Sequence, residues 1–434
     1  MKDEKSYELH AAWEEGHRIG RLIISHDRRG QMIAFEYEED WLEKHPGFML
    51  DPALFPFPGR QYAEAGLFGF LEDASPDRWG RELLKRKEQE MAEREGRSPR
   101  ELDACDFLLG VEDDVRMGGI RIYDGSAYIS HDKRRVPPLT SLRALEDCAH
   151  AFERAGAVLQ NTDFQDLISI GSSLGGARPK MNVIDEAGEI WIAKFQSDRD
   201  REHTESWEYL THELGEKCGL HMAEAKLEMI GNRSCYLTKR FDREQDARIH
   251  FASAMTMVGK RDGDDASFFD IAECISSLSC DARNDLQELW RRVTFSVLVN
   301  NTDCHLRNHG FLLTERGWRL APAYDINPNF YTKDFALAID ERNRRPDLQA
   351  VIETAPYYEV ACPREEIERM QEIIQVEYPF LAEKCRIPRE EIVKIERIWQ
   401  RWRIRRVVPG TKKAALRLLF YLIYISYTIL QKKI

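Results

Sequence analysis

The sequence lacks the patterns that would place it at once in several classes of protein. Its nine cysteines are scattered, form no CxxC pair and are odd in number, which speaks against a disulfide scaffold and against structural zinc. The first residues, MKDEKSYELHAAWEEG, contain no apolar core, so no secretory signal is expected. No internal repeat or low-complexity run occurs. These absences favour a cytoplasmic protein in a reducing compartment.

An excess of positive charge is also missing. The formal net charge of the 434-residue chain is −12, whereas a protein that coats nucleic acid needs clustered Lys and Arg. We therefore expect any contact with DNA to be made mainly through a partner. Hydrophobic residues make up 43% and aromatic residues 10% of the chain, which is ordinary for a globular protein with two or three packed units.

Long apolar runs are absent except near the carboxyl end. LLFYLIYISYTIL, Leu418 to Leu430, has no charged residue, but it is thirteen residues long and a helix needs about 20 to span a bilayer. We expect a terminal helix or strand that packs on the body of the protein. Membrane contact through residues 414–430 is the alternative.

Periodicity and turn residues predict the order of the elements. Alternating residues indicate a hairpin near the start, and Ser75-Pro76-Asp77 begins a solvent-facing helix. Further elements are a helix and a strand near 103–124, strands at 181–184, 190–195 and on both sides of Gly231-Asn232, a helix near 205–218, helical pattern from 252 to 300, a hairpin with its turn at 315–317 and a mostly helical tail.

The stretch GSSLGGARPK, residues 171–180, is a candidate anion-binding loop. Adjacent glycines, Gly175 and Gly176, let the backbone approach an anion and direct N–H groups toward it. The stretch matches neither the P-loop nor the dinucleotide GxGxxG pattern. A structural turn explains it equally well.

Lys194, in the apolar strand IWIAKF, points more clearly to function. An ammonium group in such a strand is costly unless it meets a partner. Protein kinases place a strand Lys against phosphate and hold it with a Glu of the next helix. Glu205 and Glu208 both fall on a suitable helix. A Lys that reaches solvent from an edge strand is the alternative.

The segment NTDCHLRNHG, residues 301–310, combines an acid, amides and imidazoles. Asp303 and Asn308 are five residues apart, as are the base and the metal-binding amide of the kinase catalytic loop. Asp325 follows a predicted hairpin, where kinases carry a second metal ligand. His305 and His309 suggest a transition-metal site instead, but oxygen ligands dominate the set and favour Mg²⁺.

Together these motifs resemble the HipA-type serine/threonine kinases, the toxin components of bacterial HipBA toxin–antitoxin pairs. FEYEEDWL, FGFLEDASPDRWGRELL and DFLLGVEDDVRMGGIRI resemble the amino-terminal domain of that family, and SSLGGARPK, WIAKF, KRFDR, NTDCHLRNHGFL and LAPAYDINP resemble its kinase motifs in order. The resemblance implies an α+β fold: a two-lobed protein-kinase-like unit with a mixed β N-lobe and an all-helical C-lobe, preceded by an N-terminal α/β domain. Expected ranges are 1–138, 139–250 and 251–434.

The resemblance also implies roles for individual residues. Asp303 matches the catalytic Asp, and His305 lies in the same D-x-H-x-x-N pattern and orients the loop. Ser173 falls where family members autophosphorylate, and a phosphate there would repel the phosphates of ATP. The expected ATP-binding residues are Ser173, Leu174, Gly175, Gly176, Lys180, Lys194 and Glu208, with Glu205 as the other candidate partner of Lys194, and the expected Mg²⁺ ligands are Asn308 and Asp325.

The activity implied is ATP-dependent phosphorylation of a protein hydroxyl. By the same resemblance the target is a translation component such as glutamyl-tRNA synthetase, an aminoacyl-tRNA synthetase, and the effect is growth arrest and persistence relieved by a HipB-like DNA-binding antitoxin. Two alternatives stay open: a small-molecule or lipid kinase with a related loop, and a catalytically silent corepressor that acts with such an antitoxin. The tail from about Arg405 departs from the charged helical ending expected of the family.

Overall fold

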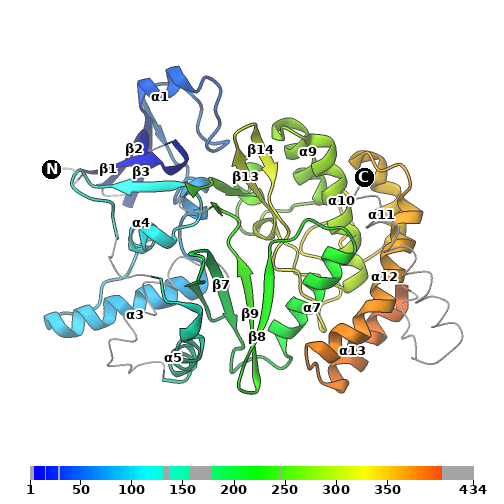
Figure 1. The fold of residues 1–434 in the computed structure, drawn as a ribbon. Coiled ribbons are helices and arrows are strands. Elements are labelled where there is room, and N and C mark those ends of the chain that lie inside the picture. The colour runs from blue at the N-terminus through cyan, green and yellow to red at the C-terminus, as the bar shows by residue number, and fades with distance from the viewer. Residues whose placement is uncertain are drawn as a thin grey trace, which may run out of the picture.

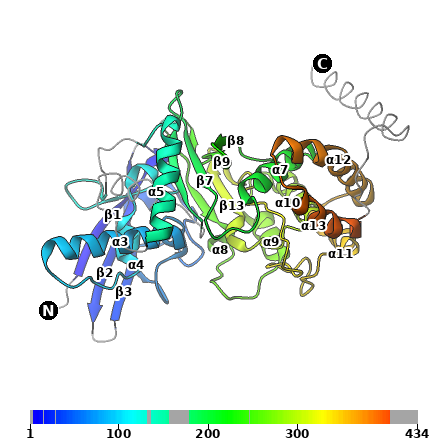
Figure 2. The ribbon, with the colours of Figure 1, turned by 90° about the horizontal axis from the view of Figure 1, so that it is seen from below.

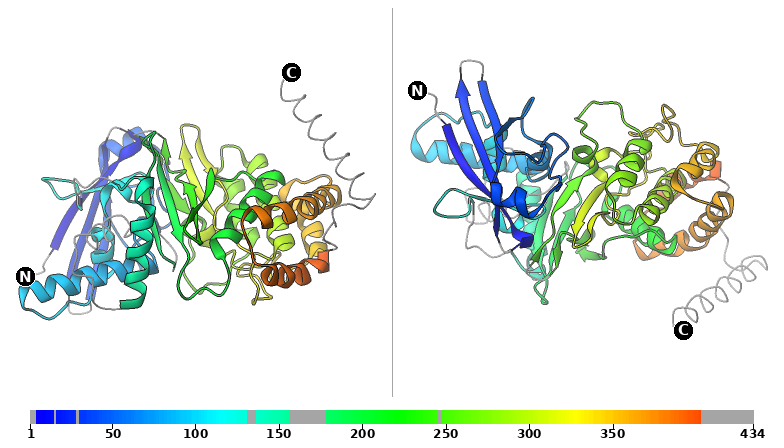
Figure 3. Two further views of the ribbon diagram at one scale, coloured as in Figure 1. Left: turned by 60° about the horizontal axis from the view of Figure 1, so that its bottom comes forward. Right: turned by 90° about the horizontal axis from the view of Figure 1, so that it is seen from above.

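The computed structural model describes residues 4–14, 16–27, 30–130, 136–155, 178–244 and 247–402. Three parts follow one another across the molecule: an N-terminal domain, a central sheet and a helical lobe (Figure 1). The view from below and the two further views keep this order, with the blue N-terminal strands at one end and the orange helices at the other (Figures 2 and 3). The expected Gly-rich loop, residues 171–177, and the apolar tail lie outside the described residues.

The N-terminal domain is built on a five-stranded antiparallel sheet in the order β4-β3-β2-β1-β5. One face of this sheet packs against short helices. Phe35 of the sheet and Phe70 and Leu108 of the helices are almost fully buried in this core. The predicted hairpin is confirmed as β2 and β3. The elements are β1 (Glu4–Ala11), β2 (His17–Asp27), β3 (Gly30–Tyr37), α1 (Glu39–Lys44), β4 (Arg60–Tyr62), α2 (Gly69–Asp73), α3 (Arg78–Glu95), α4 (Ala104–Gly110) and β5 (Ile120–Tyr123).

The predicted helix after Ser75-Pro76-Asp77 is confirmed as α3. The side chain of Asp77 accepts a hydrogen bond from the N–H of Arg78, and the helix ends at the left-handed Gly96. The indole Nε1 of Trp79 donates to the carbonyl of Lys180 at 3.0 Å, so α3 is tied to the first strand of the central sheet. This contact joins the N-terminal domain to the next part of the chain.

The central sheet has four antiparallel strands in the order β6-β7-β9-β8. One face packs against α3 and α5, and α7 lies between the sheet and the helical lobe (Figures 1 and 2). Helix α7 ends as predicted near Gly219, whose φ of +87° favours glycine. The elements are α5 (Leu142–Ala155), β6 (Lys180–Ile184), β7 (Ile190–Phe195), α7 (Thr204–Lys217), β8 (Ala225–Ile230) and β9 (Arg233–Lys239).

The helical lobe surrounds α10 and also contains a three-stranded sheet, β12-β13-β14, which includes the predicted hairpin. A small ribbon, β10 (Arg243–Glu244) and β11 (Ala247–Arg248), precedes it. The other elements are β12 (Phe251–Ser253), α8 (Ala254–Met257), α9 (Phe268–Leu278), α10 (Ala282–Val299), β13 (Gly310–Thr314), β14 (Gly317–Leu320), α11 (Leu348–Thr354), α12 (Pro363–Lys384) and α13 (Arg389–Trp399).

Two segments of this lobe are irregular where the sequence predicts helix. Residues 258–267, between α8 and α9, form no helix, because Gly259 and Gly263 take positive φ values of 65° and 93° in a polar segment. Residues 321–347 are also irregular. This segment folds back on the loop after α10, where the N–H of Ala336 donates to the carbonyl of Thr302 at 2.9 Å.

Within the ranges given above, no helix is both long and apolar enough to cross a bilayer. The run Leu418 to Leu430 belongs to residues 403–434, which are not among those ranges, so its packing stays a prediction.

Candidate active site

The loop that carries Asp303 begins where α10 ends. Asn300 adopts a left-handed conformation, with φ 61° and ψ 41°, which Asn tolerates better than most residues. The N–H groups of Asn300 and Asn301 then donate to the carbonyls of Val297 and Ser296, which closes the helix. The chain therefore leaves α10 in a fixed direction.

Asp303 and Asn308 lie at the two ends of this loop. The Nδ2 group of Asn308 donates to the carbonyl of Asp303 at 2.7 Å, so the amide oxygen of Asn308 is turned away from that bond. The carboxylate of Asp303 is exposed, and in the described ranges it takes part in no hydrogen bond or ion pair. Its neighbours Thr302 and Cys304 are buried. The loop thus presents to solvent a carboxylate that no described residue pairs with.

Asp325 is held on the other side of the site by the segment after β14. Its φ of 53° is again left-handed. The hydroxyl of Tyr324 donates to the carbonyl of Arg307 at 2.7 Å, and the hydroxyl of Thr211 donates to the carbonyl of Ile326 at 2.5 Å. Both neighbours of Asp325 are therefore anchored, one to the Asp303 loop and the other to α7.

Lys194 joins these elements. Its Nζ lies 2.6 Å from Oε1 of Glu208 on α7 and also forms an ion pair with Asp325. Burial alone would lower the pKa of Lys194, but the charges of Asp325 and Glu208 raise it well above its ordinary value. Burial would raise the pKa of Asp325, but Lys194 and Lys180 hold it well below its ordinary value. Lys194 and Asp325 are therefore both charged at neutral pH.

Lys180 is the second lysine of the site. It lies on β6 directly opposite Lys194 on β7, and its side chain is buried. Like charges on facing positions of a sheet are unfavourable unless anions lie beside them. Burial lowers the pKa of Lys180, whereas the charge of Asp325 raises it. Two lysines thus approach the same carboxylate, an arrangement suited to a polyanionic ligand.

Glu205, the other candidate partner of Lys194, has a different environment. It is 2% exposed, and its Oε2 has no hydrogen-bond partner among the described residues. Burial raises the pKa of Glu205 to about 8, with the charges of Asp200 and Glu208 adding to it and Arg178 opposing it. Glu205 is therefore neutral at pH 7, and Glu208 is the partner of Lys194.

The two histidines of the loop are not equivalent. His309 is buried against Phe268, with ring centroids 5.6 Å apart, and burial lowers its pKa to about 3. His305 is half-buried and close enough to Asp325 for its charge to influence that carboxyl. In the ranges that the structure covers, no group of three or more His, Cys, Asp or Glu side chains is arranged to hold a metal ion.

The predicted site residues thus fall into two groups. The structure brings Lys180, Lys194, Glu208 and Asp325 together beside the loop of Asp303, His305 and Asn308. Ser173, Leu174, Gly175 and Gly176 lie outside the described residues. The oxygen atoms of Asn308 and Asp325 are hard ligands of the kind that Mg²⁺ takes from a protein when phosphates and water supply the rest.

Sequence reasoning missed one residue from the N-terminal domain. Asp73, at the end of α2, accepts a hydrogen bond from the N–H of Ser253 at 2.7 Å, and the side chain of Ser253 in turn caps α8, which lies next to the Asp303 loop. Burial raises the pKa of Asp73 to about 6, although bonds from Ser253 and Thr256 and the charge of Arg307 oppose the rise. Nothing in the surrounding sequence FLEDASPD signals this contact.

The two main parts of the chain are similar to known protein families. The sequence matches the family model for the HipA N-terminal domain over residues 10–108 and that for the HipA-like C-terminal domain over residues 172–378. Y4mE of Sinorhizobium fredii, whose name presents it as a candidate kinase, is 27% identical over 348 residues, which span 72% of this chain and 76% of that protein.

A solved structure also resembles the whole chain. HipA of Shewanella oneidensis MR-1, determined in a toxin–antitoxin complex with HipB and its operator DNA, matches with a TM-score of 0.64 at 18% identity. The match covers 91% of this chain and 95% of that one. The predicted fold, a kinase-like unit preceded by an N-terminal domain, is confirmed.

Proposed function

Because the chain belongs to the HipA family, with both family domains matched in order, we propose that it is an ATP-dependent serine/threonine protein kinase. In this proposal it acts as a toxin. Its target is a translation component, an aminoacyl-tRNA synthetase such as glutamyl-tRNA synthetase, and autophosphorylation at Ser173 switches it off. A HipB-like antitoxin would hold it in check, and contact with DNA would pass mainly through that partner, in keeping with the net charge of −12.

One observation carries the proposal: Lys194 contacts both Glu208 and Asp325, and the anchored Asp325 segment lies against the loop that displays Asp303. A structural ion pair needs only one carboxylate. Here two carboxylates from different lobes meet one ammonium, and Lys180 adds a second positive charge. Phosphoryl transfer needs this combination, because the protein must position a polyanion and an attacking hydroxyl.

The roles of the residues follow from their environments. The ammonium of Lys194 has three N–H donors, so it can bind phosphate oxygens while Glu208 keeps it in place. Asn308 and Asp325 would hold Mg²⁺, which, when bound, neutralises charge on the phosphates. Asp303 accepts the proton of the substrate hydroxyl. At the same time the oxygen of that hydroxyl forms a bond to the γ-phosphorus of ATP, and the bond between this phosphorus and the β–γ bridging oxygen breaks. Its exposure leaves it accessible to a protein substrate.

The proposal is tested by comparing wild type with Asp303→Asn, first by expression in a bacterial host. Growth arrest by wild type alone supports the toxic kinase, and equal growth contradicts it. The purified proteins are then incubated with Mg²⁺, γ-labelled ATP and a bacterial lysate, and the label is located by mass spectrometry. Label on protein Ser or Thr supports the proposal. Label only on small molecules or lipids, or no transfer at all, would replace it with one of the two alternatives.

The same reaction tests the switch at Ser173. A phosphate on Ser173 in wild type, absent in Asp303→Asn, is the expected result. An unmodified Ser173 in an active enzyme rejects the switch while leaving the kinase activity in place.

A further inference from the structure

The amino-terminal end of α7 is held by a residue from far along the chain. His203 precedes the helix and provides no side-chain cap. Instead, the carboxylate of Glu391 on α13 accepts three hydrogen bonds: from the N–H of His203 at 3.2 Å, from its Nδ1 at 2.8 Å and from the indole Nε1 of Trp207 at 2.8 Å. Glu391 is 4% exposed. The buried carboxylate of Glu391 thus accepts hydrogen bonds at the amino-terminal end of α7. Its negative charge also interacts favourably with the positive end of the helix dipole.

The packing of Trp207 indicates that its hydrogen bond to Glu391 restrains the position of α7. Its ring is buried and meets Trp399 of α13 edge-on, with centroids 6.4 Å apart, and Phe330 at 5.5 Å. Phe330 belongs to the segment that follows Asp325. The same side chain therefore donates the hydrogen bond from α7 to α13 and packs between α13 and the Asp325 segment.

Glu208 follows Trp207 directly and is the partner of Lys194. One turn later, the hydroxyl of Thr211 donates to the carbonyl next to Asp325. A rotation or shift of α7 would move Glu208 away from Lys194 and disturb the Asp325 segment together. Since α7 has no N-terminal side-chain cap of its own, the carboxylate on α13 supplies the restraint.

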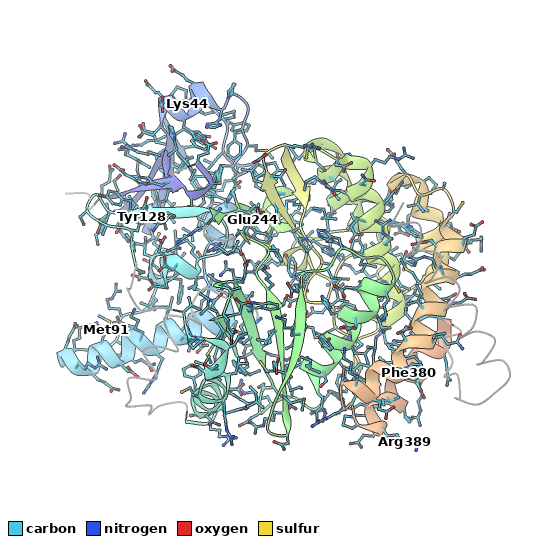
Figure 4. The ribbon with its side chains drawn as sticks, viewed as in Figure 1. Lys44, Met91, Tyr128, Glu244, Phe380 and Arg389 are labelled. Carbon is cyan, nitrogen blue, oxygen red and sulfur yellow. The ribbon has the colours of Figure 1, made fainter. Side chains whose placement is uncertain are left out.

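From these contacts we infer that Glu391 is a positioning residue, which holds α7 so that Glu208 keeps Lys194 ready for phosphate. The inference rests on the proposed function. It assigns a role to α13, which lies beyond residues 172–378, the range that matches the C-terminal family domain. Figures 1 and 2 show α13 beside α12 and close to α7, and Figure 4 labels Arg389, the first residue of α13, at the edge of the molecule.

The chain offers a matched control in Glu390. It precedes Glu391 in the first turn of α13, is exposed, and in the described part of the chain forms no hydrogen bond or ion pair. Both carboxylates lie in the first turn of α13, but of the two only Glu391 contacts described residues of α7. A difference between Glu391→Ala and Glu390→Ala therefore reports the contact with α7.

The experiment measures kcat and KM for MgATP in full-length wild type, Glu391→Ala, Glu391→Gln and Glu390→Ala. Misplacement of Glu208 by Glu391→Ala should lower kcat/KM by about 10- to 100-fold. The kcat/KM of Glu391→Gln should lie between the values of wild type and Glu391→Ala, because an amide oxygen still accepts from Trp207 while the amide nitrogen cannot accept from His203. Glu390→Ala should match wild type within about twofold.

A double-mutant comparison separates positioning from a general loss of structure. In a Glu208→Gln background, Glu391→Ala should lower kcat/KM by less than about threefold further, because both changes act on the same contact. Hydrogen exchange at residues 203–208 should be faster in Glu391→Ala than in Glu390→Ala. If the alanine variant does not fold, the same comparisons are made with Glu391→Gln.

Losses that multiply in the double variant, or equal exchange in Glu391→Ala and Glu390→Ala, would overturn the inference. If wild type transfers no phosphate, the proposed function fails. The exchange measurement then still decides whether Glu391 holds α7.

Discussion

Two clusters of buried charge differ in what holds them. At the junction with the N-terminal domain, Arg240, Asp242 and Arg243 are each at most 8% exposed and bind one another and the main chain of residues 114–118. At the candidate active site, Lys194 forms ion pairs with two carboxylates and lies 5.5 Å from the centre of the Tyr236 ring, and the side chain of Asp325 is 37% exposed. The sequence KRFDR of the first cluster resembles a kinase motif as much as WIAKF does.

The bonding partners of the two clusters distinguish buried charges that maintain the fold from buried charges that can bind a ligand. Arg240 donates to the carbonyl of Val115 at 2.6 Å and Arg243 to that of Arg116 at 2.6 Å, and neither acceptor can be exchanged for a ligand. The junction is therefore a fixed clamp between domains. At the candidate active site, a phosphate group can take the place of Asp325 at Lys194, because both are anions. Buried charges bonded to main chain maintain the fold, and those bonded only to side chains can serve chemistry.

The largest effect should come from breaking the clamp. Replacement Asp242→Asn leaves two buried guanidinium groups without their counter-charge, and we expect the free energy of unfolding to fall by about 3–5 kcal/mol. Denaturant titration measures it. Glu244→Gln, at the exposed position labelled in Figure 4, should change stability by less than about 0.5 kcal/mol. Equal effects of the two substitutions would refute the clamp.

Glu208→Gln should affect the candidate active site instead. The neutral amide no longer holds the Lys194 ammonium by charge, so we expect kcat/KM for MgATP to fall about 10²-fold. The midpoint of unfolding should change far less than in Asp242→Asn, because the side chain of Asp325, which also pairs with Lys194, is 37% exposed. A loss of stability as large as that of Asp242→Asn would erase the distinction between the two clusters.

One contribution to the pH dependence of stability should come from the junction. His250 is stacked on Trp13 with centroids 4.7 Å apart, neither ring nitrogen has a hydrogen-bond partner among the described residues, and burial lowers its pKa to about 3. Below pH 6.5 the unfolded chain binds a proton that the folded chain does not, so stability falls as pH falls from 6.5 toward 3. At pH 5 this loss should be roughly 2 kcal/mol.

His250→Phe keeps the stacked ring and cannot take up a proton. The variant should therefore lose less stability than wild type between pH 7 and pH 5, as measured by urea unfolding at both values. Identical pH profiles would show that His250 titrates normally.

Glu205→Gln should have the smallest effect. Because the pKa of Glu205 is raised to about 8, the carboxyl is already neutral at pH 7, and the amide replaces it with the same shape. We expect kcat/KM within about threefold of wild type, compared with the large loss in Glu208→Gln. If Glu205→Gln is the more damaging of the two, the assignment of Glu208 to Lys194 is wrong.

Helices, strands and the types of site residue could be predicted from the sequence better than the contacts that each residue makes. The interval from Asp303 to Asn308 and the hairpin before Asp325 are local, so they could be read from spacing. Glu205 and Glu208 both lie at the start of one helix, and only the burial of the first and the position of β7 decide between them. The contacts of Asp73 and Glu391 join residues about 180 positions apart or more, which no local pattern encodes.

The fold shows the same limit. Strongly alternating or periodic segments such as β2, β3 and α3 were predicted at nearly their observed positions. The segment between α8 and α9 falls within the helical pattern that the sequence predicts from 252 to 300. Its two glycines at positive φ and its contacts with residues 335–344 decide otherwise.

We propose that the carboxylate of Asp303 acts on a substrate hydroxyl and has no part in holding the fold. The most direct measurement is the rate of γ-phosphoryl transfer from MgATP by wild type and Asp303→Asn, with the unfolding midpoint of both. We expect the rate to fall by about 10²- to 10⁴-fold, as on loss of a catalytic base, and the midpoint to be unchanged. Equal rates, or a loss of rate that follows a loss of folded protein, would contradict the account.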